Sequence, residues 1–231
     1  MNDHILTLAR EYAPCYLYEY DVMRRQVETL RQAFPRYDLL YSIKANPFPP
    51  VVRALAGLGL GADAASAPEV LLSRRCGMAK ADIFFSAAGK SDAALEAAWD
   101  EGEIIADSLV EVARIGALCK AKGQRRAIGV RMNPGFGMGG TVGGPSKFGI
   151  NEEDLPQLKA LLDTLPVTVE GIHVHLKSQN LDADVLGGCY RDSWALAKRV
   201  QDALACGMRY VNFGSGVGVA YDEAFEQPMA L

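Results

Sequence analysis

The sequence predicts an α/β fold of the TIM type, a (β/α)8 barrel that lacks its last strand. Seven short apolar and β-branched runs recur at spacings of about 20 residues, with helix-like segments between them. This alternation indicates parallel strands covered by helices, and so many repeats favour a barrel. The runs are residues 39–45, 60–65, 82–87, 103–107, 127–132, 169–176 and 209–213.

Length and composition suit one sizeable core. The chain has 231 residues, of which 49% are hydrophobic and 23% charged. An eighth strand would still be needed where the sequence stops, so we expect a fragment or a truncated gene product. Two unpaired edges of such a barrel favour association with a partner.

The first 35 residues are expected to lead into the barrel, which would occupy residues 36–231. Residues 14–20 predict a strand, and the apolar positions of residues 22–34 predict a helix. Helix starts inside the barrel are marked by capping boxes or their relatives, in which an acid follows three residues after the cap. These boxes begin at Ser66, Ser108 and Asn151.

Charge and cysteine content argue against several classes of protein. A net charge of −4 offers no basic patch for nucleic acid, and no apolar run reaches the roughly 20 residues of a membrane helix. The N-terminus lacks a basic segment followed by an apolar one, so a cytoplasmic location is predicted. The five cysteines are widely spread, which disfavours a disulfide framework or a structural zinc site.

Lys44 is the first candidate for chemistry. It lies in the run 39–45, which Asn46-Pro47 ends. A lysine at the end of a buried strand is poorly solvated, which disfavours the ammonium and favours condensation of the amine with an aldehyde as a Schiff base. This chemistry suggests pyridoxal 5'-phosphate. The alternative is a lysine whose stem packs while its charge reaches water.

Two other charged residues come at the carboxyl ends of predicted strands, where barrel enzymes place their sites. Asp63 follows the second run, and its alternative role is to form a turn. Arg131 ends the fifth run, where its permanent charge suits an anion or a carboxylate network. Closing a barrel layer by pairing with a neighbouring carboxylate is the alternative for Arg131. The glycine-rich segment 135–149 predicts a mobile loop over the site.

His173 and His175 alternate along the sixth run and are expected to face the same side. Paired histidines can bind zinc, but a third ligand is needed and His4 is the only histidine left. No metal is therefore predicted.

Three glycines follow the seventh run, at Gly214, Gly216 and Gly218. Glycines let the backbone bring its N–H groups close to an anion, and the loop after the seventh barrel strand is a recurrent phosphate site. A dinucleotide site would instead need Gly-x-Gly-x-x-Gly between an early strand and a helix, which this segment does not provide.

In this order the motifs resemble the barrel portion of the fold type III, pyridoxal-phosphate-dependent amino acid decarboxylases, the diaminopimelate and ornithine decarboxylase family. That barrel is of the alanine racemase and decarboxylase kind. The resemblance runs from about Pro14 to Tyr221. It is carried by Lys44 in its Tyr-Ser-Ile-Lys-Ala-Asn setting, Asp63, Lys147-Phe148-Gly149, His175 and the Gly214 loop.

The resemblance implies decarboxylation of an α-amino acid, diaminopimelate or a related substrate, through a Schiff base on Lys44. It implies that His175 stacks on the pyridine ring and that Ser178 touches the phosphate. Two positions depart from the family, because Lys177 and Ser215 stand where glycine is usual. The other cofactor-binding residues implied are Asp63, Arg131, Gly214, Ser215, Gly216 and Gly218.

The resemblance also implies a homodimer and a C-terminal β-domain, with further active-site residues beyond this C-terminus. Three other functions stay open. A non-catalytic cofactor carrier would bind pyridoxal phosphate without amino acid turnover, and a scaffold descended from a decarboxylase would not bind it. An amino acid racemase is the third, although the His-x-His-x-x-Ser order is more like the decarboxylases. Which amino acid is the substrate cannot be read from these residues.

Overall fold

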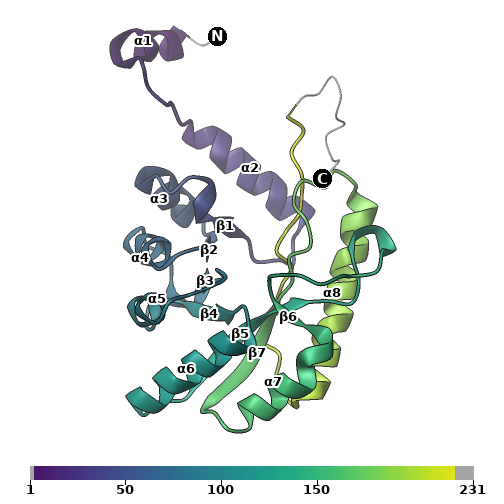
Figure 1. Ribbon diagram of the computed structural model, residues 1–231. Helices are drawn as coiled ribbons and strands as arrows, with labels where there is room; N and C mark the ends of the chain where they lie inside the picture. Colours follow the sequence, from purple (N-terminus) through teal and green to yellow (C-terminus); the bar gives the residue numbers. More distant parts are fainter. Residues whose placement is uncertain (1–2, 222–231) are drawn as a thin grey trace.

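The computed structural model describes residues 3–221 and shows a curved, parallel sheet with helices on its outer side (Figure 1). Each strand is hydrogen-bonded to the next in the order β1-β2-β3-β4-β5-β7-β8, and the short β6 (Ile150–Asn151) pairs with β5. All seven predicted strands are confirmed, and among the described residues β1 and β8 are the two edges of an open barrel. Their bounds are β1 (Leu40–Ser42), β2 (Gly61–Ala64), β3 (Ile83–Phe85), β4 (Glu103–Ala106), β5 (Arg126–Asn133), β7 (Val167–His173) and β8 (Tyr210–Asn212).

The helices follow the strands in sequence and cover the convex side of the sheet (Figure 1). They are α3 (Pro49–Gly57), α4 (Ala67–Arg75), α5 (Asp92–Ala98), α6 (Leu109–Lys122), α7 (Leu155–Leu162) and α8 (Ala183–Leu204). Two more helices precede the sheet, α1 (Asp3–Tyr12) and α2 (Tyr20–Ala33). None of the helices within residues 3–221 is long and apolar enough to cross a membrane.

The N-terminal segment differs from the sequence prediction. The helix predicted over residues 22–34 is confirmed as α2, but residues 14–20 form no strand. A strand needs a neighbour for its backbone hydrogen bonds. Within the described part of the chain no strand lies beside this segment, whose residues are exposed. Its clearest attachment is the Tyr18 hydroxyl, which accepts a hydrogen bond of 3.0 Å from Asn46 Nδ2.

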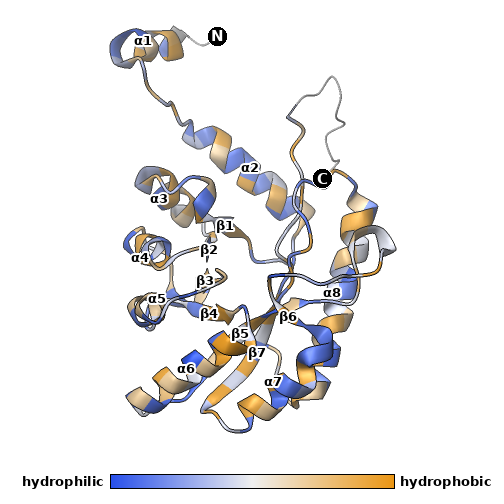
Figure 2. Cartoon of the chain, in the orientation of Figure 1, coloured by the Kyte–Doolittle hydropathy of each residue, from blue (hydrophilic) through white to orange (hydrophobic). Residues whose placement is uncertain are grey.

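The core lies between the sheet and its helices, where buried apolar residues of the strands meet those of the helices. Hydrophobic residues colour much of β5, β7 and the helices beside them (Figure 2). The larger cluster joins β4, β5 and β7 to α6, α7 and α8, with Ile128, Ile172 and Leu158 fully buried. A second cluster joins β2 and β3 to α3 and α4. Period-two alternation then leaves the polar residues of the same strands on the concave face.

Tyr210 fills the concave face at mid-height. A Cβ at Gly129 or Gly171 would lie 2.3 Å or 2.2 Å from atoms of the Tyr210 side chain, so only glycine leaves room for this ring. The ring also packs against Phe84 of β3, with 5.0 Å between centroids. The ring therefore fills the interior below the carboxyl ends of the strands, the end at which barrel enzymes place their sites.

Two of the three predicted helix caps are confirmed. Ser66 and Ser108 each accept a hydrogen bond from the backbone N–H three residues later, at Glu69 and Glu111. Asn151 does not cap a helix, because its side-chain amide donates to Asp154 (3.0 Å) instead.

Candidate functional site

Polar side chains form one layer across the carboxyl ends of the strands. The register pairs Ser42 of β1 with Asp63 of β2, and aligns Arg131, His173 and Asn212 on β5, β7 and β8. Residues in register on parallel strands share a face. Because the outward-facing neighbours of these residues belong to the core, the layer faces the open concave side.

Asp63 links three strands of this layer. Its carboxylate accepts a hydrogen bond from Ser42 Oγ (3.3 Å) and a short one from Ser86 Oγ. Asp63 lies inside β2, so the turn-forming alternative is wrong. Two hydroxyl donors from the flanking strands fix the orientation of this carboxylate.

The expectation that Lys44 is buried at a strand end is wrong. β1 ends at Ser42, and Lys44 lies in the 3-10 turn Ile43–Ala45 with its side chain exposed. The physical reason is that β1 is an edge strand, so only β2 covers it. The charge of Lys44 is nevertheless among those that lower the pKa of the buried His173.

Arg131 pairs with a carboxylate, as the alternative interpretation of this residue held. Its Nη1 lies 3.2 Å from Asp107 Oδ1, and both side chains are largely buried. The guanidinium also stacks on the Phe148 ring, 4.8 Å from its centroid. The Lys147-Phe148-Gly149 end of the glycine-rich loop therefore lies over this ion pair.

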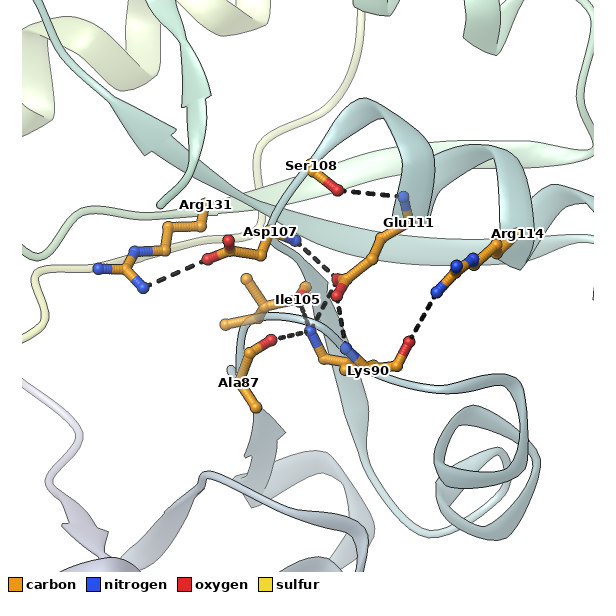
Figure 3. Close-up of polar contacts among 8 residues, drawn as sticks. All are labelled: Ala87, Lys90, Ile105, Asp107, Ser108, Glu111, Arg114 and Arg131. Carbon is orange, nitrogen blue, oxygen red and sulfur yellow. Dashed lines mark hydrogen bonds and ion pairs between the residues drawn. The ribbon is translucent and has the colours of Figure 1, made fainter. Parts of the chain in front are cut away.

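A buried ion pair next to Asp107 was missed by the sequence analysis (Figure 3). Lys90 Nζ lies 3.0 Å from Glu111 Oε2, with both side chains almost fully buried. Glu111 also accepts hydrogen bonds from the backbone N–H groups of Lys90 (2.8 Å) and Asp107 (2.9 Å). The available signal was the Ser108 capping box, but nothing in the spacing of residues 90 and 111 indicates that they meet.

His173 is a further residue of the site that the sequence pattern alone did not assign to it. It is buried, and within residues 3–221 its Nδ1 has no hydrogen-bond partner. Burial, followed by the charges of Arg131, His175, Lys90 and Lys44, lowers the pKa of His173 from 6.5 to about 3. A neutral imidazole with a free ring nitrogen therefore lies in the polar layer.

His175 connects two loops at the site. Its Nδ1 lies 2.8 Å from the Gly214 carbonyl, and its Nε2 lies 3.4 Å from Ser178 Oγ. Because a carbonyl can only accept, Nδ1 carries a proton and donates it to the Gly214 carbonyl, while Nε2 lies within hydrogen-bond reach of the serine hydroxyl. The imidazole is thus held in one orientation between the loop after β7 and the turn after β8. Its ring centroid is 6.5 Å from that of His173.

The turn after β8 has left-handed backbone at Gly214, Ser215 and Gly216, with φ of 62°, 58° and 107°. Consecutive residues of this kind turn their N–H groups toward a common point, where an anion can bind. The amides of Gly214 and Gly218 are already bonded, to Asn212 Oδ1 and the Asn180 carbonyl. Within residues 3–221 the amides of Ser215 and Gly216 have no such partner.

Gly214 and Gly216 also allow this turn to approach the loop after β7. A Cβ at Gly214 would lie 2.4 Å from the Val174 carbonyl, and one at Gly216 2.8 Å from the Lys177 carbonyl. Lys177 itself is exposed and contributes its backbone to this contact. The two loops are joined further by a bridge between Asn180 and Val217.

The arrangement suits a phosphorylated cofactor that carries an aldehyde. The Lys44 amine is a nucleophile for the aldehyde, and the two unbonded amides after β8 can hold a phosphate. The imidazole of His175 lies beside this turn, bonded to the Gly214 carbonyl. Among residues 3–221, no three His, Cys, Asp or Glu side chains gather closely enough to hold a metal ion.

Comparison with known proteins identifies the family. The family model described as "Pyridoxal-dependent decarboxylase, pyridoxal binding domain" matches residues 20–230. An L-glutamyl-[BtrI acyl-carrier protein] decarboxylase of Niallia circulans is 31% identical over 216 residues, which cover 90% of this chain and 50% of that protein. A diaminopimelate decarboxylase of Methanothermobacter thermautotrophicus is 30% identical, with 97% of this chain and 54% of that protein covered.

A solved structure gives the same result for the fold. Diaminopimelate decarboxylase of Helicobacter pylori, complexed with L-lysine, superimposes with a TM-score of 0.83 at 26% identity, covering 99% of this chain and 60% of that one. The chain spans about half the length of the curated relatives it matches. It belongs to the pyridoxal-dependent decarboxylase family, in which it corresponds to the pyridoxal binding domain.

Proposed function

We propose that this chain is the cofactor-binding part of an enzyme that decarboxylates an α-amino acid with pyridoxal 5'-phosphate held on Lys44. The observation that carries the proposal is the set of groups that follow the strands: the exposed Lys44 amine, the oriented Asp63 carboxylate, the fixed His175 imidazole and, within residues 3–221, two unbonded amides after β8. The pyridine ring of the bound cofactor supplies an electron sink for the bond that breaks.

Lys44 acts as the amine that holds the cofactor's aldehyde. As an exposed residue of a 3-10 turn on an edge strand, it can turn toward the concave face or away from it without disturbing the core. Asp63 has no such freedom, because Ser42 and Ser86 hold its carboxylate. The carboxylate is therefore the fixed negative charge that an ammonium in the layer would face.

The phosphate would bind at the turn after β8. Its oxygens would accept from the amides of Ser215 and Gly216 and from the Ser178 hydroxyl, while Gly214 and Gly218 shape the turn. His175 would lie against the ring, in the orientation set by its bond to the Gly214 carbonyl. Arg131, paired with Asp107, adds a permanent positive charge on the far side of the layer.

The substrate class follows from the relatives. Several of them are named diaminopimelate decarboxylases, and we propose an α-amino acid of that kind as the substrate. The homodimer, the cytoplasmic location and the division at residue 35 stay predictions from the sequence.

The test begins with the absorbance spectrum of the purified chain with pyridoxal phosphate. We expect a band at about 420 nm for the cofactor joined to a lysine. Borohydride should then fix the cofactor to the peptide that contains Lys44, as read by mass spectrometry. Lys44→Ala should abolish both signals, while Lys120→Ala, which removes an exposed lysine of α6, should change neither.

The reaction itself is tested on a form of the protein that includes the part corresponding to the rest of its relatives. Release of carbon dioxide from diaminopimelate, lost in Lys44→Ala, is the expected result. A labelled Lys44 without carbon dioxide release from any amino acid would favour the carrier. No label on Lys44 in either form would overturn the proposed function.

A further inference from the structure

We propose that Lys90 and Glu111 are positioning residues of the site, which hold Asp107 so that its carboxylate fixes Arg131 beside His173. The inference rests on the proposed function for its meaning, but the geometry that carries it lies in the contacts of this chain. Lys90 and Glu111 do not themselves reach the open layer, so their effect passes through Asp107 (Figure 3).

The first step is that the pair ties two βα turns together. Lys90 Nζ donates to the Ile105 carbonyl (2.6 Å) and, in a short bond, to the Ala87 carbonyl. Glu111 holds the Lys90 amide with Oε1 and the Asp107 amide with Oε2. The backbone after β3 and the backbone on both sides of Ala106 are thus fixed by one ion pair.

The second step is that stability alone explains such a pair poorly. Burial lowers the pKa of Lys90, which shows that keeping this ammonium out of water costs folding free energy. An apolar pair of similar volume could fill the same space without that cost. What an apolar pair lacks is the set of directed hydrogen bonds to the Asp107 and Lys90 amides. Those bonds are what a positioning role requires.

The third step leads from Asp107 to the layer. The Asp107 amide is fixed by Glu111, and its carboxylate lies 3.2 Å from Arg131 Nη1. Arg131 is the register partner of His173 on the neighbouring strand, and its guanidinium supports the Phe148 ring of the glycine-rich loop. The series of contacts Lys90–Glu111–Asp107–Arg131 therefore leads to two residues of the candidate site, His173 and Phe148.

Two readouts follow, one of which needs no cofactor. The first is the protonation of His173, which faces the charges of Arg131, His175, Lys90 and Lys44. The chain has only three histidines, so labelled imidazoles can be followed one by one in nuclear magnetic resonance titrations. The second is the dissociation constant of pyridoxal phosphate, measured by fluorescence.

The decisive variant replaces the whole pair, Lys90→Met with Glu111→Leu, so that no charge is left buried alone. We expect it to fold, with its cofactor dissociation constant raised at least tenfold and His173 protonated at a pH at least one unit higher. Arg131→Lys should weaken cofactor binding in the wild-type background and add nothing in this variant, since Arg131 is already released there.

Controls separate positioning from stability. Leu158→Ala removes a fully buried side chain of α7 and should lower the unfolding midpoint without changing either readout. If the double variant does not fold, Asp107→Asn, which keeps the shape and removes the charge facing Arg131, should raise the cofactor dissociation constant in the same way.

Additive effects of the pair and Arg131, or unchanged readouts in a folded variant, would overturn the inference. Failure of the proposed function looks different. In that case the wild type itself binds no pyridoxal phosphate, while the His173 titration of the variants still reports on the chain of contacts.

Discussion

The two sides of the candidate site are built differently. Around the ends of β3, β4 and β5 the polar groups are buried and bonded to one another, as in the Lys90–Glu111 and Asp107–Arg131 pairs. After β1 and β8 the groups proposed to meet the cofactor, Lys44 and the amides of Ser215 and Gly216, are open within residues 3–221. The difference follows from position in the sheet, because central strands have two neighbours and edge strands one.

This difference separates two tasks. The bonded side holds charges in fixed places before anything binds, which is what preorganised electrostatics requires. The open side keeps donors and a nucleophile free for a ligand. Substitutions on the bonded side should therefore change stability strongly, whereas substitutions on the open side should change binding.

The largest expected effect tests the bonded side by removing half of its ion pair. Lys90→Met leaves the Glu111 carboxylate buried without its cation, which should cost roughly 3–5 kcal/mol of unfolding free energy. Lys44→Met, which removes an exposed lysine from the open side, should change it by less than about 0.5 kcal/mol. Urea unfolding of both variants measures the contrast. Equal losses would mean that the two sides do not differ.

A smaller effect concerns pH and His173. The folded-state pKa of His173, about 3, lies below the ordinary 6.5. Below pH 6.5 the unfolded chain therefore binds a proton at this residue that the folded chain does not bind. Stability must therefore fall as the pH drops from 6.5 toward 3. Between pH 7 and pH 5 this group should remove about 2 kcal/mol.

His173→Gln should lose this dependence. We expect the difference in unfolding free energy between pH 7 and pH 5 to shrink by that amount, as measured by urea unfolding at both pH values. His4→Gln removes an exposed histidine and serves as the control. A variant that keeps the full pH dependence would show that His173 is not the residue responsible.

Features of the fold that depend on residues close in sequence were predicted correctly, whereas features that depend on distant neighbours were not. Strand positions were readable, because buried runs such as Ile104 and Ile105 or Ile128 and Val130 repeat between helices. The local capping boxes at Ser66 and Ser108 were readable for the same reason, since each involves residues three apart. The strand expected over residues 14–20 was wrong because pairing depends on a distant neighbour.

Contacts between distant residues explain what was missed. Lys90 and Glu111 are separated by 21 positions and meet only after two βα units pack. The burial of His173 and the exposure of Lys44 are likewise set by whether a strand lies inside the sheet or at its edge. The motifs gave the order of the candidate residues, but the neighbours of each one are a property of the sheet.

The smallest expected effect is that of Ser215→Gly in the turn after β8, which contrasts with the effect of Gly214→Ala beside it. Gly214→Ala places a Cβ 2.4 Å from the Val174 carbonyl at a φ of 62°, and should cost about 2 kcal/mol. Ser215→Gly removes the steric strain of a serine in the left-handed region at φ 58°. It also gives the unfolded backbone more conformational entropy to lose on folding, and these opposing effects, each of about 1 kcal/mol, nearly cancel.

Ser215→Gly should therefore leave the unfolding free energy within about 0.5 kcal/mol of wild type. The hydroxyl accepts only a long hydrogen bond, 3.4 Å from the Val217 N–H, so little is lost with it. Urea unfolding together with the dissociation constant of pyridoxal phosphate distinguishes the contributions of this residue. If affinity is kept, the backbone amides bind the phosphate. If it falls at unchanged stability, the Ser215 hydroxyl is itself a ligand, and the open side uses a side chain where glycine is usual in the resembled family.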